Sequence, residues 1–268
     1  ISTKVLINHG LTPQEIFFYR FLIAYLGIWV ISPKRLFTNN WQDELWLVAG
    51  GIFGGSLYFF TENTALGITQ ASNVSFIICT APLLTTILSL LFYKSEKASK
   101  GLIYGSLLAL MGVGLIVFNG SFVLKISPIG DLLTLLAALS WAFYSLIIKK
   151  MAGRYPTIFI TRKIFFYGVL TILPAFLLHP LHPDTAVLLQ PAVLFNLLFL
   201  AVLASLICYV LWNVVLKQLG TVRASNYIYL NPLVTMIASF LILDEKITLV
   251  ALGGAACIVC GVYWAEKK

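Results

Sequence analysis

The chain has 268 residues, of which 60% are apolar and 10% are charged, and its mean hydropathy is +0.94. Soluble domains are about 45–50% apolar and about 25% charged, so this composition excludes a soluble globule, a disordered chain and a small disulfide scaffold. The formal net charge is +8, but the basic residues lie between apolar runs rather than along one face. This pattern excludes nucleic acid as a partner. We expect an integral membrane protein surrounded by the lipid bilayer.

Apolar runs in chain order predict the membrane spans, because a crossing helix needs about 20 mainly apolar residues. Segment 1–9 is typical of the end of a helix, so we expect the first helix to begin before Ile1. Nine full spans follow, at 13–32, 44–66, 70–93, 101–119, 129–149, 156–178, 192–216, 222–243 and 247–265. Lipid offers no partner for backbone amides, and the alternation of a barrel strand is absent. The sequence therefore predicts an all-α protein with ten transmembrane helices.

Lysine and arginine are distributed unevenly between alternate loops. One set of loops holds most of them, from Lys34 and Arg35 to Lys267 and Lys268, whereas the other set holds Lys125 and Lys246. Basic loops stay on the cytoplasmic side of a membrane. We therefore expect both termini in the cytoplasm.

The two halves of the chain match each other. An offset of 143 pairs Gly10, Pro13 and Arg20 with Gly153, Pro156 and Lys163. An offset of 150 pairs Asn63, Ser75, Pro82, Thr85 and Ser89 with Asn213, Ser225, Pro232, Thr235 and Ser239. An offset of 149 pairs Glu96, Lys97, Gly105 and Gly112 with Glu245, Lys246, Gly254 and Gly261.

These matches predict two repeats, 1–120 and 128–268, with five spans each. Because five is an odd number, the second repeat enters the membrane from the opposite side. Inverted repeats are typical of secondary transporters, whose similar halves exchange conformations around a fixed site. Some channels also have them.

The ordered set of these features resembles a known group. It comprises ten spans, the Pro13 to Arg20 segment, 71–73 leading to Pro82, and 222–225 leading to Pro232. Together they resemble the drug/metabolite transporter superfamily, in its EamA-type branch, over essentially the whole chain. The resemblance implies a bacterial inner-membrane exporter of amino acids or related metabolites. It also implies a central cavity walled by the third, fourth, eighth and ninth helices.

Charged residues inside spans tend to face water or a partner, because their insertion in lipid is costly. Glu62, Lys4 and Arg20 fall at similar depths in the outer half. We expect them to line an outer vestibule in which Glu62 binds an ammonium group or a proton. The alternative is a structural ion pair, or snorkelling to the interface. Arg162 and Lys163 fall in the inner half, where they attract anionic groups or snorkel to lipid headgroups.

Polar and aromatic residues gather before the paired prolines. Pro82 and Pro232 are expected to kink their helices and leave carbonyls available to a ligand. The predicted pocket suits zwitterionic or aromatic small molecules and comprises Asn63, Asn73, Phe76, Thr80, Trp141, Tyr144, Tyr209, Trp212, Asn213, Ser225 and Tyr229, with Glu62. The alternative is that the polar groups bond between helices and the aromatic rings mark interfaces.

Other classes of protein have less support in the sequence. The motifs HExxH and GxSxG do not occur, so we do not expect an enzyme. The Cys257/Cys260 pair lacks further ligands, and we expect no cofactor and no metal site. The glycines at 50–51 and 54–55 favour packing within a monomer over dimerisation. We expect a secondary transporter working by alternating access. The alternatives are an exchanger of phosphorylated or nucleotide-linked sugars and a channel-like facilitator.

Overall fold

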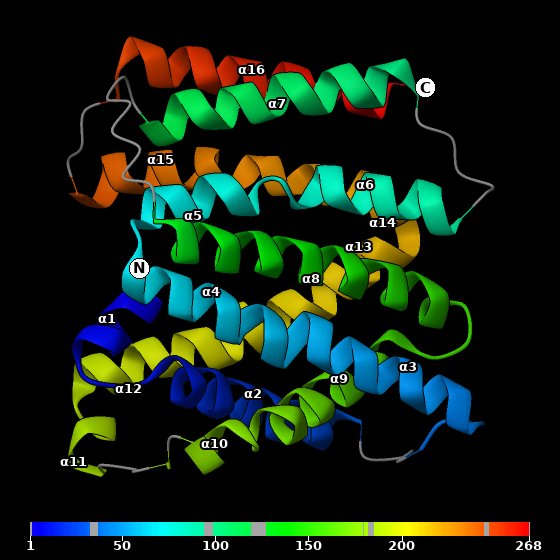
Figure 1. Cartoon of the computed structure of the whole chain (residues 1–268), viewed down its shortest axis with the longest axis vertical. Coiled ribbons are helices and arrows are strands. Elements are labelled where there is room, and N and C mark those ends of the chain that lie inside the picture. The colour runs from blue at the N-terminus through cyan, green and yellow to red at the C-terminus, as the bar shows by residue number, and fades with distance from the viewer. Residues whose placement is uncertain are drawn as a thin grey trace. The chain divides into compact units, whose positions relative to one another are not determined.

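The computed structural model describes residues 2–32, 37–93, 99–118, 127–178, 180–181, 185–243 and 247–267, with the backbone alone at 71–72, 178 and 238–243. All regular elements in these ranges are helices, so the all-α prediction is confirmed (Figure 1). Contacts divide the chain into two compact units, which we describe one at a time. The first unit is Ile1–Gly67 with Phe143–Gln218, and the second is Ile68–Ala142 with Leu219–Lys268.

Two long helical rods in the first unit each contain a π-helical segment. One rod is α3 (Trp41–Gly51), η1 (Ile52–Ser56) and α4 (Leu57–Ile68). The other is α12 (Pro191–Leu198), η2 (Phe199–Ile207) and α13 (Cys208–Leu219). The remaining helices of this unit are α1 (Ser2–Asn8), α2 (Pro13–Ile31), α9 (Thr157–Ile172), α10 (Ala175–Leu178) and α11 (Thr185–Leu188).

The second unit has two interrupted rods and one long helix pair. The rods are α5 (Ala71–Ile78) with α6 (Ala81–Phe92), and α14 (Thr221–Asn226) with the 3₁₀ helix η3 (Tyr227–Leu230) and α15 (Asn231–Leu243). The pair is α7 (Lys100–Phe118) and α16 (Leu249–Glu266). Helix α8 (Pro128–Ala152) begins in the second unit and ends in the first.

Seven of the described helical runs are long and apolar enough to cross a membrane, so the chain is a multi-pass membrane protein. They are Pro13–Ile31, Asn73–Phe92, Lys100–Phe118, Pro128–Ala152, Thr157–Leu177, Pro191–Leu219 and Leu249–Glu266. Each coincides with an expected span. The expected spans 44–66 and 222–243 are also helical, but neither is among the seven. The matched Glu–Lys pairs at 96–97 and 245–246 lie outside the described residues.

The start of α2 shows how the sequence sets a helix end. Thr12 is the N-cap, and its hydroxyl accepts a hydrogen bond from the Glu15 amide. The Glu15 carboxylate in turn accepts one from the Thr12 amide at 2.9 Å, which completes a capping box. Gly10 has φ +92°, a left-handed conformation that suits glycine, and it lies in the turn between α1 and α2.

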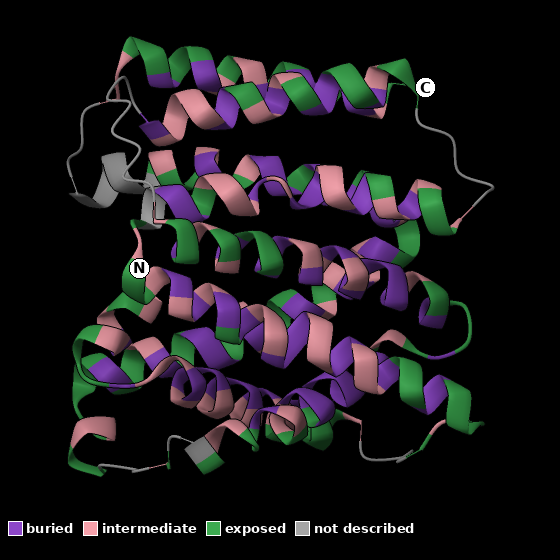
Figure 2. Ribbon diagram, in the orientation of Figure 1, coloured by how far each residue is buried: buried purple, intermediate pink, exposed green. Residues whose placement is uncertain are grey.

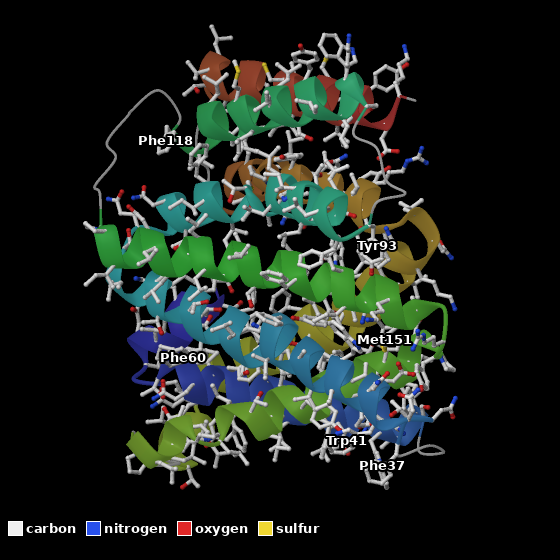
Figure 3. All side chains as sticks on the ribbon, turned by 45° about the vertical axis from the view of Figure 1, so that its right-hand side comes forward. Phe37, Trp41, Phe60, Tyr93, Phe118 and Met151 are labelled. Carbon is white, nitrogen blue, oxygen red and sulfur yellow. The ribbon has the colours of Figure 1, made fainter. Side chains whose placement is uncertain are left out.

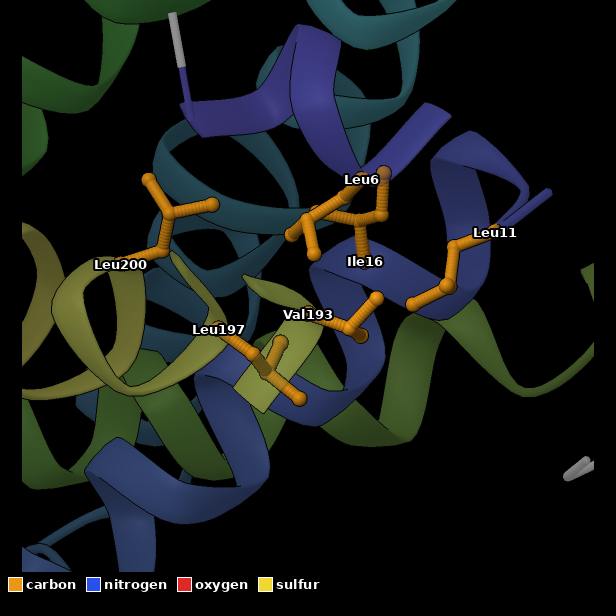
Figure 4. Close-up of a cluster of buried hydrophobic side chains, with 6 residues drawn as sticks. All are labelled: Leu6, Leu11, Ile16, Val193, Leu197 and Leu200. Carbon is orange, nitrogen blue, oxygen red and sulfur yellow. The ribbon is translucent and has the colours of Figure 1, made fainter. Parts of the chain in front are cut away.

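A cluster of aliphatic side chains in the first unit joins the N-terminal segment to the α12–η2 rod (Figure 4). Its buried members from the N-terminal segment are Leu6, Leu11 and Ile16. They pack against three residues of the α12–η2 rod, which are Val193, Leu197 and Leu200. The N-terminal helix therefore packs against a rod almost two hundred residues away in sequence.

Glycines bring the helices of the first unit close together. A Cβ atom on Gly51 would lie 2.5 Å from the Tyr167 Cβ on α9, and one on Gly54 would overlap the Tyr144 ring on α8. A Cβ atom on Gly55 would lie 3.2 Å from the Gly168 Cα on α9. The glycine spacing at 50–55 therefore serves packing within the chain, as predicted.

Glycines also join α7 and α16 in the second unit, which lie side by side and antiparallel (Figure 1). Gly105 faces Gly261, and Gly112 faces Gly254. At the offset of 149, Gly105 matches Gly254, and Gly112 matches Gly261. The two contacts therefore map onto each other when each glycine is replaced by its match.

Large apolar side chains are exposed on both units, as expected for surfaces that face lipid. On α7, Tyr104 and Met111 are more than 60% exposed, and exposed positions alternate with buried ones along the helix (Figure 2). In the first unit, Phe37 and Trp41 are exposed near the N-terminal end of α3 (Figure 3). Aromatic residues at helix ends are typical of the membrane–water interface.

Candidate functional site

The structure divides the predicted site residues between the two units. The first unit contains Lys4, Arg20, Glu62, Asn63, Tyr144, Lys163, Tyr209, Trp212 and Asn213. The second contains Asn73, Phe76, Thr80, Pro82, Trp141, Ser225, Tyr229 and Pro232. The ion pairs between described side chains, Arg154 with Asp43 and Lys163 with Glu44, are in the first unit.

Arg20 on α2 is a buried cation whose side chain is held on two sides. Its residue is 5% exposed, and its Nε donates a hydrogen bond to the Ser205 hydroxyl at 2.9 Å. The guanidinium carbon lies 4.2 Å from the centre of the Phe59 ring, within cation–π range. Ser205 belongs to the π-helical segment η2, and Phe59 to α4. Two rods therefore position this guanidinium.

Glu62 lies one turn beyond Phe59 on α4 and is partly exposed. The Tyr58 hydroxyl donates a hydrogen bond to its Oε1 at 3.2 Å. The carboxylate and the Arg20 guanidinium attract each other electrostatically. Glu62 and Arg20 therefore interact electrostatically within the first unit, and their predicted role in a vestibule stays a prediction.

An aromatic cluster includes Phe59, the ring that contacts Arg20. The Tyr209 ring lies 5.7 Å from Phe21 and 5.5 Å from Phe165, between ring centres. The Tyr209 hydroxyl donates a hydrogen bond to the carbonyl of Gly54. Gly54 is in η1, where the π-helical geometry displaces the backbone hydrogen bonds from the α-helical pattern. Tyr209 therefore links α13 to the π-helical segment of the other rod.

A chain of buried hydrogen bonds runs through Asn213. Its Oδ1 accepts a bond from the Tyr144 hydroxyl at 2.7 Å, and its Nδ2 donates one to the Thr161 hydroxyl at 2.9 Å. The three side chains come from α8, α13 and α9 and are all at most 1% exposed. Asn63, the repeat counterpart of Asn213, donates one longer bond of 3.4 Å to the Pro13 carbonyl. The matched asparagines therefore have unequal surroundings.

Lys163 is paired with an acid that we did not predict. Its ammonium forms an ion pair with Glu44, and both side chains are more than 90% buried. The Tyr167 hydroxyl donates a hydrogen bond to the same carboxylate oxygen. The other oxygen accepts two bonds from Thr38, at 2.9 Å from the amide and 2.6 Å from the hydroxyl. The sequence favoured snorkelling of this lysine to lipid headgroups as one reading, and the structure places it inward instead.

A second acid beside Glu44 is also satisfied. The Asp43 carboxylate forms an ion pair with Arg154 at 2.6 Å and accepts a hydrogen bond from the Tyr155 hydroxyl at 2.8 Å. Asp43 and Glu44 occupy the first turn of α3, where the helix dipole favours negative charge. At this end of the first unit, both acids of the first turn of α3 are therefore paired with a cation.

Lys4 makes a hydrogen bond to the end of helix α4. Its ammonium donates a hydrogen bond to the Leu66 carbonyl at 2.9 Å. Leu66 is in the last turn of α4, where carbonyls lack helical partners and a cation is favourable. The contact caps α4, and a vestibule role for Lys4 stays a prediction.

In the second unit the predicted residues pack into an apolar cluster. Tyr229 is buried together with Cys79 and Ala109, and Phe76 packs against the edge of this cluster. The Phe76 ring lies 5.3 Å from the Phe118 ring. Asn73 and Ser225 are also buried, whereas Thr80 and Trp141 are partly exposed.

Both predicted kink positions coincide with interruptions of α-helical geometry. Helix α5 ends at Ile78, and α6 begins at Ala81 with Pro82 in its first turn. The Thr80 amide bonds to the Ile77 carbonyl at 2.9 Å, in a tighter turn. Pro232 follows the 3₁₀ helix η3 in the same way. The repeat-matched prolines therefore stand at matched interruptions.

Sequence reasoning missed Ser205, Glu44, Tyr167 and Thr161. Ser205 is a polar residue inside the apolar run 197–212, and this isolation is a signal that could have found it. Glu44 follows an Asn N-cap and could have been identified as a first-turn acid. Nothing in the sequence indicated which cation each acid contacts, because these partners lie more than a hundred residues away.

Apolar helices that cross a membrane, with charged and polar side chains buried between them, define a multi-pass membrane protein of the transporter class. The chain matches the EamA-like transporter family over residues 1–118 and 128–265, and it belongs to that family. The family and the relatives are transporters, so the chain is not an enzyme.

Several known proteins are similar to the chain. An uncharacterised transporter of Archaeoglobus fulgidus is 30% identical, over 96% of this chain and 89% of that protein. A probable amino-acid metabolite efflux pump of Escherichia coli is 23% identical, over 95% and 86%. One solved crystal structure covers 99% of this chain and 90% of its own, with a TM-score of 0.80 at 18% identity, which shows a shared fold.

Proposed function

We propose that the protein is a secondary transporter that exports amino acids or similar small metabolites across a bacterial inner membrane by alternating access. The observation that carries the proposal is the buried cation of Arg20 near the carboxylate of Glu62, inside an EamA-type helical protein. Charged residues inside a membrane-crossing protein are costly to insert, and they commonly mark the substrate path.

Alternating access is commonly built on two similar halves of opposite orientation, and several matched features support them here. At the repeat offset of 150, η1 corresponds to residues 202–206 inside η2. The two glycine contacts of α7 with α16, Gly105 with Gly261 and Gly112 with Gly254, map onto each other at the offset of 149. We therefore propose ten helices in two inverted repeats, 1–120 and 128–268, in a monomer with both termini in the cytoplasm.

The substrate class follows from the charges and from the names of two relatives. The similar proteins of Escherichia coli and Salmonella typhimurium are described as probable amino-acid metabolite efflux pumps. A carrier of phosphorylated or nucleotide-linked sugars needs several basic side chains that are available to bind the phosphate groups of the ligand. Here the Lys163 ammonium is neutralised by Glu44. This pairing favours a ligand with no net charge.

Counterflow in proteoliposomes tests the proposal. Purified protein is reconstituted with an unlabelled mixture of the twenty amino acids inside, and the uptake of each labelled amino acid is followed. Saturable exchange of at least one amino acid is expected, whereas protein-free liposomes show none. Fluxes that do not saturate would support the channel-like alternative. Exchange limited to sugar phosphates, in liposomes loaded with them, would support the exchanger of phosphorylated sugars.

A further inference from the structure

Two matched cations, one from each proposed repeat, lie near opposite ends of the same helical rod, and each interacts with an acid of that rod. Lys163 and Arg20 are counterparts at the offset of 143. Lys163 pairs with Glu44 near the beginning of the α3–η1–α4 rod, and Arg20 attracts Glu62 near its end. The two pairs differ in how many of their hydrogen-bonding groups have a partner.

The Lys163 pair is saturated. Both Glu44 oxygens are engaged, one by Lys163 and Tyr167, and the other by two bonds from Thr38. The ammonium also lies 3.3 Å from the Tyr167 hydroxyl. A buried ion pair with its remaining bonds satisfied is a structural element that offers nothing to a ligand.

The Arg20 pair is unsaturated among the described residues. A guanidinium has five N–H donors, and here Nε makes the one hydrogen bond, to Ser205. Phe59 covers one face of the group. The two terminal nitrogens are thus left as a planar fork. The Glu62 carboxylate accepts one bond, from Tyr58. A buried cation in this state costs free energy unless a further partner supplies the bonds.

We propose that Arg20 and Glu62 together recognise the charged groups of a zwitterionic α-amino acid, a proposal that rests on the proposed function. The Arg20 fork binds the α-carboxylate through both terminal nitrogens, and Glu62 accepts from the α-ammonium. Ser205 and Phe59 are positioning residues that hold the guanidinium, and Tyr58 orients the carboxylate.

The charge arithmetic selects a zwitterion over singly charged ligands. Arg20 and Glu62 sum to zero, so a ligand with one positive and one negative group leaves every charge paired. An organic anion would satisfy Arg20 but lie next to the Glu62 carboxylate, and an amine would lie next to the guanidinium. Leaving a charge unpaired in this way is how a site rejects the wrong ligand.

Ligand analogues test the proposal on the unmodified protein. Thermal unfolding of the purified full chain is measured with each of the twenty amino acids, because a ligand of the folded state raises the unfolding temperature. The amino acid with the largest shift is then compared with its amide, its decarboxylated amine and its N-acetyl derivative. The amino acid is expected to stabilise the protein, and each analogue is expected to bind at least about tenfold more weakly.

Variants assign the two contacts to their residues. Arg20→Lys keeps the charge but removes the fork, and Glu62→Gln keeps the shape but removes the charge. Both are expected to weaken amino-acid binding by about tenfold or more. Lys150→Gln removes one exposed cation from the same unit and is the matched control, with unchanged affinity expected.

The outcomes separate this inference from the proposed function. Equal binding of the amino acid and its amide, or equal affinity of Arg20→Lys and Lys150→Gln, would overturn the inference. If proteoliposomes exchange amino acids but the variants leave their affinity unchanged, the transport proposal stands and the assignment of Arg20 and Glu62 fails. If no amino acid binds or is exchanged, both proposals fail.

Discussion

Gly261 lies against Gly105 where α16 crosses α7. A Cβ atom on Gly261 would lie 2.5 Å from the Gly105 carbonyl oxygen and 2.5 Å from the Ala109 amide nitrogen. Both atoms belong to helix backbone, which cannot move without disturbing hydrogen bonds. We expect Gly261→Ala to lower the free energy of unfolding by about 1–3 kcal/mol, as overpacking does. The thermal unfolding midpoint in detergent measures this.

Gly253 on the same helix provides the control. A Cβ atom there has no heavy atom within 4 Å, so alanine fits in open space. Alanine in a helix interior is favoured over glycine by about 0.5–1 kcal/mol. Gly253→Ala should therefore leave the unfolding midpoint unchanged or raise it. Equal losses for the two variants would show that the glycine contact is not a tight one.

The ion pair of Lys163 with Glu44 yields a second prediction. Lys163→Met leaves a buried carboxylate without its cation, and breaking such a pair costs about 3–5 kcal/mol. Combining it with Glu44→Gln should restore part of the loss, because the charge left behind is also removed. A double-mutant cycle of unfolding free energies checks this coupling.

The control for this pair is Arg154, whose ion pair with Asp43 is more exposed. The Arg154 side chain is 54% exposed, so solvent screens its charge. Arg154→Gln is expected to cost at most about 1 kcal/mol. A loss as large as that of Lys163→Met would contradict the contrast between a saturated interior pair and a screened one.

The matched asparagines should respond unequally to truncation. Asn213→Ala removes two buried hydrogen bonds, to the hydroxyls of Tyr144 and Thr161, and each such bond contributes about 0.5–1.5 kcal/mol. Asn63→Ala removes one bond of 3.4 Å. We therefore expect a clearly larger fall in the unfolding midpoint for Asn213→Ala. Identical falls would mean that the hydrogen-bonded chain adds nothing to stability.

Tyr209→Phe tests the link between the two π-helical rods. The repeat counterpart of Tyr209 is Phe59, which also packs in the aromatic cluster, so a phenylalanine ring suits this environment. Losing the bond to the Gly54 carbonyl should cost about 1 kcal/mol. Tyr263→Phe, on an exposed ring of α16, should leave the unfolding midpoint unchanged. Similar midpoints for both variants would show that the link carries no stability.

The helical runs were predictable because apolar runs of this length have one solution in lipid, in which each backbone amide bonds within its own helix. The packing role of the glycines at 50–55 was also predictable, since small residues at this spacing let helices approach. The partner of Lys163 was not, because a hydropathy pattern contains no information on which acid lies opposite. The hold of Ser205 on Arg20 was hidden for the same reason, since 185 residues separate them.

The sequence by itself determined that this chain crosses a membrane as helices and that its halves share a spacing of prolines and glycines, because hydropathy and residue spacing are local and countable. Only the tertiary structure decided that Lys163 is neutralised by Glu44 while the Arg20 guanidinium keeps its terminal nitrogens for another partner. Whether a buried charge is saturated depends on the side chains that several helices bring to it, and that geometry exists only after the helices have packed.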